Sequence, residues 1–474
     1  MATSGAAHHS EPGGGGPPAP PPVDPELAGD HLSSLPAVGE GPDGTAAPLV
    51  ALEREPNRLL RLAKVLGPGL ITGAADDDPS AVGTYAVAGA SLGFAPLWTA
   101  PLTMPLMATA VYLCGKLGMV SGLGLGGVLR RYYPRWLLFP VVIAFVIANT
   151  LNAAADLGAI AAGINLLLPV PQPILVVAAA VAIVGLQVLG SYETVERWLR
   201  WLSLALLGYV AASILAHPDW SAVLHGTLVP TLRLDKPFIA TLVAIIGTTI
   251  SPYLFFWQAG QQVEEEISLG RRVRRRRLGA TDTELKYLGW DVNAGMVFSN
   301  LVMYFIILGS AATLYQAGQT SITSAADAAQ ALRPLAGDAA GLLFALGFIG
   351  VGFIGVPVMT TGAAYAVAEA LNWPHGLHKQ PRRARRFYVV IAGCTLVALG
   401  LNFLGINPIQ ALVGVAILNG LLMPPLLVVT LLATNQRAIM GSRTNGWGLN
   451  VLGWLTVLIG VAAMAGLAWT TLGA

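Results

Sequence analysis

Long apolar runs separated by short polar joints make up the chain from about residue 65 onward. Most runs reach roughly 20 residues, the length that a helix needs to cross a bilayer. Alternating β patterns are absent, and a backbone in lipid must satisfy its own hydrogen bonds. We therefore predict an all-α integral membrane protein with about eleven transmembrane helices. The predicted spans are 65–92, 94–115, 136–168, 173–190, 198–216, 238–260, 290–314, 339–371, 387–403, 405–434 and 447–472.

The composition agrees with a membrane location. Of the 474 residues, 54% are hydrophobic and only 11% are charged, whereas soluble proteins carry about 25% charged residues. The first part of the chain is different, because it is rich in Gly, Pro and Ala and lacks the material for a core. We predict a disordered cytoplasmic tail over 1–55, followed by a transmembrane domain over 56–474.

Lysine and arginine gather in every second joint. If the N-terminus is cytoplasmic, 24 of the 27 basic residues lie on the cytoplasmic side, and only Arg233, Lys236 and Arg333 lie outside. The positive-inside rule then predicts an N-in, C-out protein in the cell membrane, the inner membrane in a bacterium. The run RRVRRRR at 271–277 resembles a nucleic-acid patch, but between two spans it is better explained as a topology anchor near anionic lipid. We expect membrane lipid and no nucleic acid as a partner, and a monomer or weak dimer.

The first span contains the sequence GAADDDPSAVG, in which Asp76, Asp77 and Asp78 precede Pro79. One charged Asp at the bilayer centre costs about 2.5–3.5 kcal/mol on insertion scales. Proline also removes a helical hydrogen bond and pushes the residue before it toward an extended conformation. We therefore predict a helix that is interrupted near the middle of the membrane, with carboxylates and freed carbonyls facing a polar cavity.

A second interruption is predicted in the sixth span, where Ser251-Pro252 follows Gly247, Thr248 and Thr249. This span opens a second group of five, and an odd number makes that group enter the membrane from the opposite side. Paired breaks in two inverted halves are typical of a transporter with its site at the midplane. We predict repeat one at about 60–217, repeat two at about 236–434, and an extra helix at about 447–472.

Several segments resemble the NRAMP divalent-metal transporter family. GPGLITGAADDDPSAVGTYAVAGA (67–90) resembles its first helix, with an Asp-Pro-Gly-Asn motif at the break. IGTTISPY (246–253) resembles its sixth helix, which carries Met-Pro-His, and ADLGAIAAGINLL (155–167) resembles its third. The resemblance implies a LeuT-type fold with a 5+5 inverted repeat.

The departures from the family pattern indicate a different ion. The family Asp aligns with Asp78, and its two backbone-carbonyl ligands align with Ala75 and Thr248. The family Asn, Met and His fall on Ala81, Ser251 and Tyr253. Of the acidic pair that the family uses for protons, only one member is present, at Asp156 and not at Ala153, which puts proton coupling in doubt.

Loss of a thioether ligand makes the predicted site harder, and the smaller side chains make it wider. Thioethers select transition metals, whereas oxygen ligands suit Mg2+ and Mn2+, and Mg2+ keeps several of its waters. The substitutions therefore resemble the magnesium branch of the family. We rank Asp78 first as a ligand, Asp77 second and Asp76 third. The predicted metal site is Asp78, Asp77, Asp76, Ala75, Thr248 and Ser251, lined by Ala81, Thr249, Tyr253, Asn152 and Asp156.

The predicted function is membrane transport of a hard divalent cation, Mg2+ first and Mn2+ second, by alternating access between the broken helices. Two alternatives stay open: a proton-coupled Mn2+/Fe2+ importer of the usual NRAMP type, and a Na+-coupled organic-solute symporter of the same fold. We expect no enzyme activity and no cofactor, since the ion is the substrate. Outside this site, we interpret Glu264, Glu265 and Glu266 as a solvated helix end, and His375 and His378 as residues of a basic surface loop.

Overall fold

The computed structural model describes residues 68–189, 207–333, 337 and 340–472. The predicted tail over 1–55 lies outside the described residues. So do six of the basic residues used for the orientation: Arg54, Arg58, Arg61, Lys64, Arg197 and Arg200.

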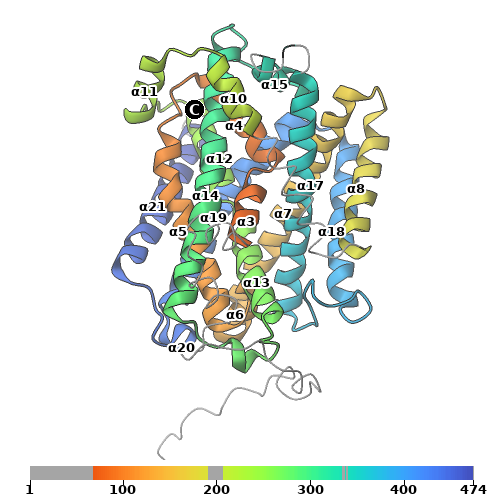
Figure 1. Cartoon of the computed structure of the whole chain (residues 1–474), viewed down its shortest axis with the longest axis vertical. Helices are drawn as coiled ribbons and strands as arrows, with labels where there is room; N and C mark the ends of the chain where they lie inside the picture. Colours follow the sequence, from red (N-terminus) through yellow and green to blue (C-terminus); the bar gives the residue numbers. More distant parts are fainter. Residues whose placement is uncertain (1–67, 190–206, 334–336, 338–339, 473–474) are drawn as a thin grey trace, which may run out of the picture.

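The described residues form an all-helical bundle (Figure 1). Among them, eight helices are long and apolar enough to cross a membrane, if the two halves of the sixth span are taken together. Seven of these are built on continuous helices. They are α5 (Thr99–Ser121), α7 (Arg135–Leu167), α14 (Asp282–Ser310), α17 (Ala340–Ala370), α18 (Arg385–Leu401), α19 (Pro408–Asn435) and α21 (Trp447–Leu472).

The other four predicted spans are shorter or interrupted, and since the sixth is already among the eight, the first, fourth and fifth explain the difference between eleven and eight. The first span is divided into α3 (Pro68–Asp76) and α4 (Pro79–Leu92), and the sixth into α12 (Lys236–Thr249) and α13 (Tyr253–Ser268). The fourth is α8 (Gln172–Leu189). Of the fifth, α10 (Leu207–Leu215) is described, and the part before it lies outside the described residues.

Short helices cap the two ends of the bundle. One end carries α11 (Trp220–Leu228) and α15 (Ala325–Ala329), and the other carries α6 (Leu125–Tyr132) and α20 (Arg437–Met440) (Figure 1). We call the second one the basic end, because Arg130, Arg131 and Arg437 lie on its helices. This grouping agrees with the predicted orientation, which remains a prediction. The remaining short turns are η4 (Arg274–Arg277), η5 (Ala311–Tyr315), η6 (Gln330–Leu332) and η8 (Asn402–Leu404).

The two broken helices run in opposite directions through the middle of the bundle. In Figure 1, α3 and α13 lie toward the basic end, and α4 and α12 lie toward the other end. Glycines let the broken helices touch neighbouring backbones: a Cβ added at Gly73 of α3 would lie 2.2 Å from the carbonyl oxygen of Gly295 in α14. A Cβ added at Gly247 of α12 would lie 2.2 Å from the carbonyl oxygen of Ala416 in α19. These contacts hold the breaks among packed helices.

Candidate ion site

The first break occupies Asp77 and Asp78, as the sequence predicts. Asp76 is the last residue of α3, and Pro79 is the first residue of α4. Asp78 is extended, with φ −61° and ψ 171°, and caps α4. Its Oδ1 accepts hydrogen bonds from the backbone N–H of Ala81 at 2.7 Å and from the hydroxyl of Ser80 at 2.6 Å. The cap and the proline at N1 together explain why a new helix starts here.

The second break lies between Thr249 and Tyr253, also as predicted. The hydroxyl of Ser251 turns back and donates to the carbonyl oxygen of Thr248 at 2.5 Å. Pro252 has no N–H to donate, so a break at this position leaves carbonyls without helical partners. Ser251 therefore satisfies one of the two carbonyls that the family resemblance assigns to the ion.

Tyr253 connects the two breaks. Its hydroxyl lies 2.9 Å from the carbonyl oxygen of Ala75 and 3.0 Å from Oδ2 of Asp78, so it can donate to either. Ala75 is the other carbonyl that the resemblance assigns to the ion. Both predicted carbonyl ligands are thus hydrogen-bonded by side chains that stand where the family has Met and His.

Asp76 and Asp77 face α14 instead. The hydroxyl of Ser299 lies 3.1 Å from Oδ2 of Asp76 and 3.2 Å from Oδ1 of Asp77. The second oxygen of each carboxylate, Asp76 Oδ1 and Asp77 Oδ2, is buried and has no hydrogen-bond partner among the described residues. Sequence reasoning missed Ser299, although the pair Ser299-Asn300 inside an apolar run was a signal.

All three aspartates are fully buried, and none forms an ion pair with a basic residue in the part of the chain that the structure describes. Their carboxylates do not meet at one point, since no group of three acidic, His or Cys side chains within that part is arranged to hold a metal ion. The acids are divided instead: Asp78 points to the start of α4, and the other two point to α14. Buried carboxylates without a cation are unstable unless a proton or a metal ion neutralises them.

Three of the predicted lining residues, Ala81, Thr249 and Tyr253, lie at or next to the two breaks. The hydroxyl of Thr249 lies 3.0 Å from that of Tyr85. Asn152 of α7 donates to Asn419 of α19 at 3.0 Å. Asp156, also on α7, is fully buried, and neither of its carboxylate oxygens has a hydrogen-bond partner in the part of the chain that the structure describes.

Asp156 and Asp78 lie on either side of Gly355 in α17. A Cβ added at Gly355 would be 3.0 Å from Cβ of Asp78 and 3.2 Å from Oδ2 of Asp156. The third-helix acid is therefore close to the first break, where the resemblance places it.

A thioether that sequence reasoning overlooked also lies near the site. Sδ of Met303 in α14 is 3.5 Å from the hydroxyl of Thr249 and 3.9 Å from the amide nitrogen of Asn300. Thr249 has a shorter acceptor, the carbonyl oxygen of Ile245 at 2.7 Å, and Asn300 has one in the hydroxyl of Thr103 at 3.2 Å, so neither donor is committed to the sulfur. The wall of the site therefore contains a soft atom.

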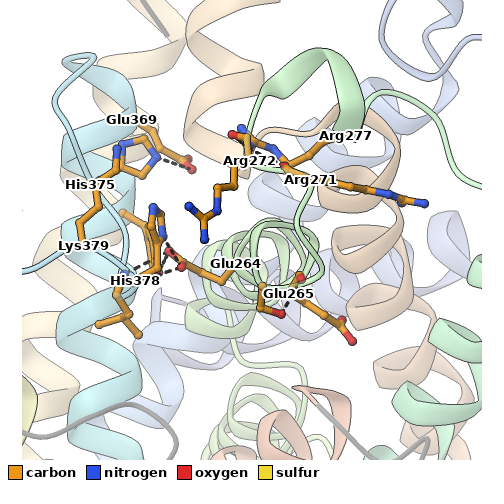
Figure 2. A network of polar contacts seen from close by, with 12 residues as sticks. Glu264, Glu265, Arg271, Arg272, Arg277, Glu369, His375, His378 and Lys379 are labelled. Atoms are coloured by element: carbon orange, nitrogen blue, oxygen red, sulfur yellow. Dashed lines mark hydrogen bonds and ion pairs between the residues drawn. The ribbon is translucent and has the colours of Figure 1, made fainter. Parts of the chain in front are cut away.

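A separate polar network lies at the basic end and corrects two interpretations made from the sequence (Figure 2). Glu264 of α13 is not simply solvated: it accepts hydrogen bonds from the hydroxyl of Tyr365 at 2.8 Å and from Nδ1 of His378 at 2.5 Å. His375 also faces an acid, with Nε2 3.8 Å from Glu369. The sequence alone did not show that the loop carrying both histidines folds back onto α13 and α17.

Glu266 is likewise buried and paired. Arg271 donates to Glu266 at 2.9 Å and to Glu284 of α14 at 2.7 Å. Burial alone would lower the pKa of Arg271, but the hydrogen bond and ion pair with Glu266 outweigh it and hold the pKa above its ordinary value. This part of the basic run thus joins α13 to α14 inside the protein.

An all-helical membrane bundle with two helices broken at its centre, running in opposite directions, defines a transporter of the LeuT fold. The model of the Nramp family, described as natural resistance-associated macrophage protein-like, matches residues 69–470. The chain belongs to this family.

Relatives and solved structures agree with this assignment. The chain is 28% identical to the divalent metal cation transporter MntH of Deinococcus radiodurans, over 88% of this chain and 92% of that one. It is 27% identical to MntH of Klebsiella pneumoniae, over 87% and 95%. The manganese transporter of Eremococcus coleocola has the same fold, with TM-score 0.66, 20% identity and coverage of 93% and 91%. Mhp1, a nucleobase-cation-symport-1 transporter, is similar at TM-score 0.52 and 15% identity, over 85% and 93%.

Proposed function

We propose that this protein transports a divalent cation across the membrane, and that the ion is Mg2+ carried with most of its water. One observation carries the choice of ion. The two carbonyls that would contact a dehydrated metal accept hydrogen bonds from Ser251 and Tyr253, while Asp76 and Asp77 each keep a buried oxygen to which no described residue donates.

The free carboxylate oxygens suit a hydrated ion because they can accept hydrogen bonds from its water ligands. Mg2+ gives up water reluctantly and is commonly bound through one or two carboxylates, with its waters retained. Waters on the ion are donors, and the free oxygens of Asp76 and Asp77 are acceptors. Asp78, which shares the hydroxyl of Tyr253 with Ala75, supplies a third carboxylate across the break.

The two broken helices, in the first and sixth spans, suggest how the ion is transported. We infer that repeat one (about 60–217) and repeat two (about 236–434) rock around the site and expose it to each side in turn, with 447–472 as an extra helix. A membrane potential that is negative inside favours entry of a divalent cation by about 4.6 kcal/mol per 100 mV, twice the electrical free energy for one charge. Uptake therefore needs no second ion.

A second candidate is a proton-coupled importer of Mn2+ or Fe2+. The names of the MntH relatives, divalent metal cation transporters, fit it as well as they fit Mg2+, and Met303, whose thioether is in the wall of the site, favours a softer ion. Asp156 supports proton coupling, because its carboxylate lies without partners beside the first break. An organic-solute symporter is less favoured, since three buried aspartates repel a carboxylate substrate.

Uptake into proteoliposomes tests the proposal. The full-length protein is reconstituted, and entry of Mg2+, Mn2+ and Fe2+ is followed with metal-sensitive dyes, together with a pH-sensitive dye inside. We expect Mg2+ uptake that follows the membrane potential without acidification. Uptake of Mn2+ or Fe2+ but not Mg2+, with acidification, would establish the second candidate instead.

A further inference from the structure

We propose that Ser299 of α14 is a positioning residue for the transported ion, an inference that rests on the proposed function. Its hydroxyl lies between Oδ2 of Asp76 and Oδ1 of Asp77, donates to one of them at a time, and leaves the other oxygen of each carboxylate available to the hydrated cation. The site is then formed by three spans: the broken first span, the broken sixth span and α14. The last of these acts on the ion through Asp76 and Asp77.

The packing of α3 against α14 places Ser299 beside Asp76 and Asp77. Gly73 of α3 and Gly295 of α14 let the two backbones come into contact. Both helices leave the basic end in the same direction (Figure 1). One turn further along each, three to four residues later, come Asp76 and Asp77 on one side and Ser299 on the other. The glycine contact therefore sets the register that brings the hydroxyl to the acids.

One hydroxyl proton is available for two carboxylates. A serine donates a single hydrogen bond at a time, and its oxygen is 3.1 Å from Asp76 and 3.2 Å from Asp77. Adjacent carboxylates repel each other and would turn apart if nothing stood between them. Ser299 offsets that repulsion and fixes which oxygens are free, so the site is organised before the ion arrives.

The neighbouring residue has a different role. Asn300 joins α14 to α5: it donates to the hydroxyl of Thr103 at 3.2 Å and lies near the sulfur atoms of Met107 and Met303. Ser310, one further serine on α14, is also fully buried, but its hydroxyl has no hydrogen-bond partner among the residues that the structure describes. Ser310 therefore provides a matched control for removing a buried hydroxyl from the same helix.

The experiment compares Mg2+ uptake by proteoliposomes containing wild type, Ser299→Ala, Ser299→Cys, Ser299→Thr and Ser310→Ala. Loss of the hydroxyl should raise the apparent KM for Mg2+ about tenfold, the effect of one hydrogen bond to a charged group, with the maximal rate within about twofold. Cysteine, which keeps the size but is a weak donor, should behave like alanine. Threonine should restore the wild-type KM, and Ser310→Ala should leave it unchanged.

An unchanged KM in both Ser299→Ala and Ser299→Cys overturns the inference, and so does a Ser299→Thr variant as weak as Ser299→Ala. If wild type carries Mn2+ but not Mg2+, the proposed ion is wrong, and the same variants are measured with Mn2+. A tenfold rise in that KM then supports the role of Ser299, and no rise overturns it. A wild-type protein that moves no divalent cation overturns both proposals.

Discussion

The aspartates at the first break and the glutamates at the basic end are buried or partly buried, yet within the described residues only the glutamates have basic partners. Glu266 and Glu284 share Arg271, and Glu264 and Glu369 face His378 and His375. No basic side chain in the described residues pairs with Asp76, Asp77 or Asp78.

This difference distinguishes acids that join helices from acids that await a ligand. A buried acid with its own arginine is internally neutral, and breaking that pair is costly. A buried acid whose partners are hydroxyls and a backbone N–H is still short of positive charge. In a membrane protein, such a group is a functional candidate by default.

The largest effect is expected at the paired acids. Arg271→Met should lower the free energy of unfolding by about 3–5 kcal/mol, because it leaves Glu266 and Glu284 buried without a cation. Thermal unfolding in detergent measures the loss, and uptake by the surviving folded protein should keep the wild-type KM. A changed KM with unchanged stability would mean that this cluster belongs to the ion site.

Asp78→Asn should have the next largest effect, and on transport. Asparagine caps a helix as well as aspartate does, so α4 should remain intact while the charge is lost. Uptake of Mg2+ should fall about a hundredfold, as expected when a charged partner is lost from a buried site. Circular dichroism and thermal unfolding serve as controls. Near-wild-type uptake would remove Asp78 from the site.

Tyr253→Phe should change selectivity more than rate. The substitution leaves the carbonyl of Ala75 without its donor and free to contact a less hydrated ion. We expect the preference for Mg2+ over Mn2+ to fall about fivefold, close to the 1 kcal/mol net value of a hydrogen bond. Competition between the two ions during uptake measures it. An increased preference for Mg2+ would contradict the assigned role of the hydroxyl.

His378→Ala should have the smallest effect. The pair with Glu264 is partly exposed, with 33% of the histidine side chain accessible, and exposed ion pairs contribute about 0–1 kcal/mol. Tyr365 and the loop backbone still donate to Glu264. We expect a small drop in unfolding temperature and no change in ion preference. A shift in selectivity would link the basic end to the site.

The sequence predicts both breaks because their causes are local: a proline, an acid run and polar neighbours within a few residues. The residues that the family resemblance assigns as carbonyl ligands, Ala75 and Thr248, lie beside the breaks, and their role as ligands stays a prediction. The partners of Asp76 and Asp77 could not be read in this way, because Ser299 reaches them through a glycine contact between helices more than 200 residues apart. The pairing of Glu264 with His378 similarly depends on how a loop folds.

Asp78 is both a proposed ligand of the ion and the N-cap of α4. Oδ1 of this residue is the acceptor that starts α4, through the N–H of Ala81. If Asp78 binds the ion as proposed, a cation that draws the carboxylate toward itself takes that acceptor from the helix, and its departure returns it. Loading and unloading would then act directly on the backbone between α3 and α4.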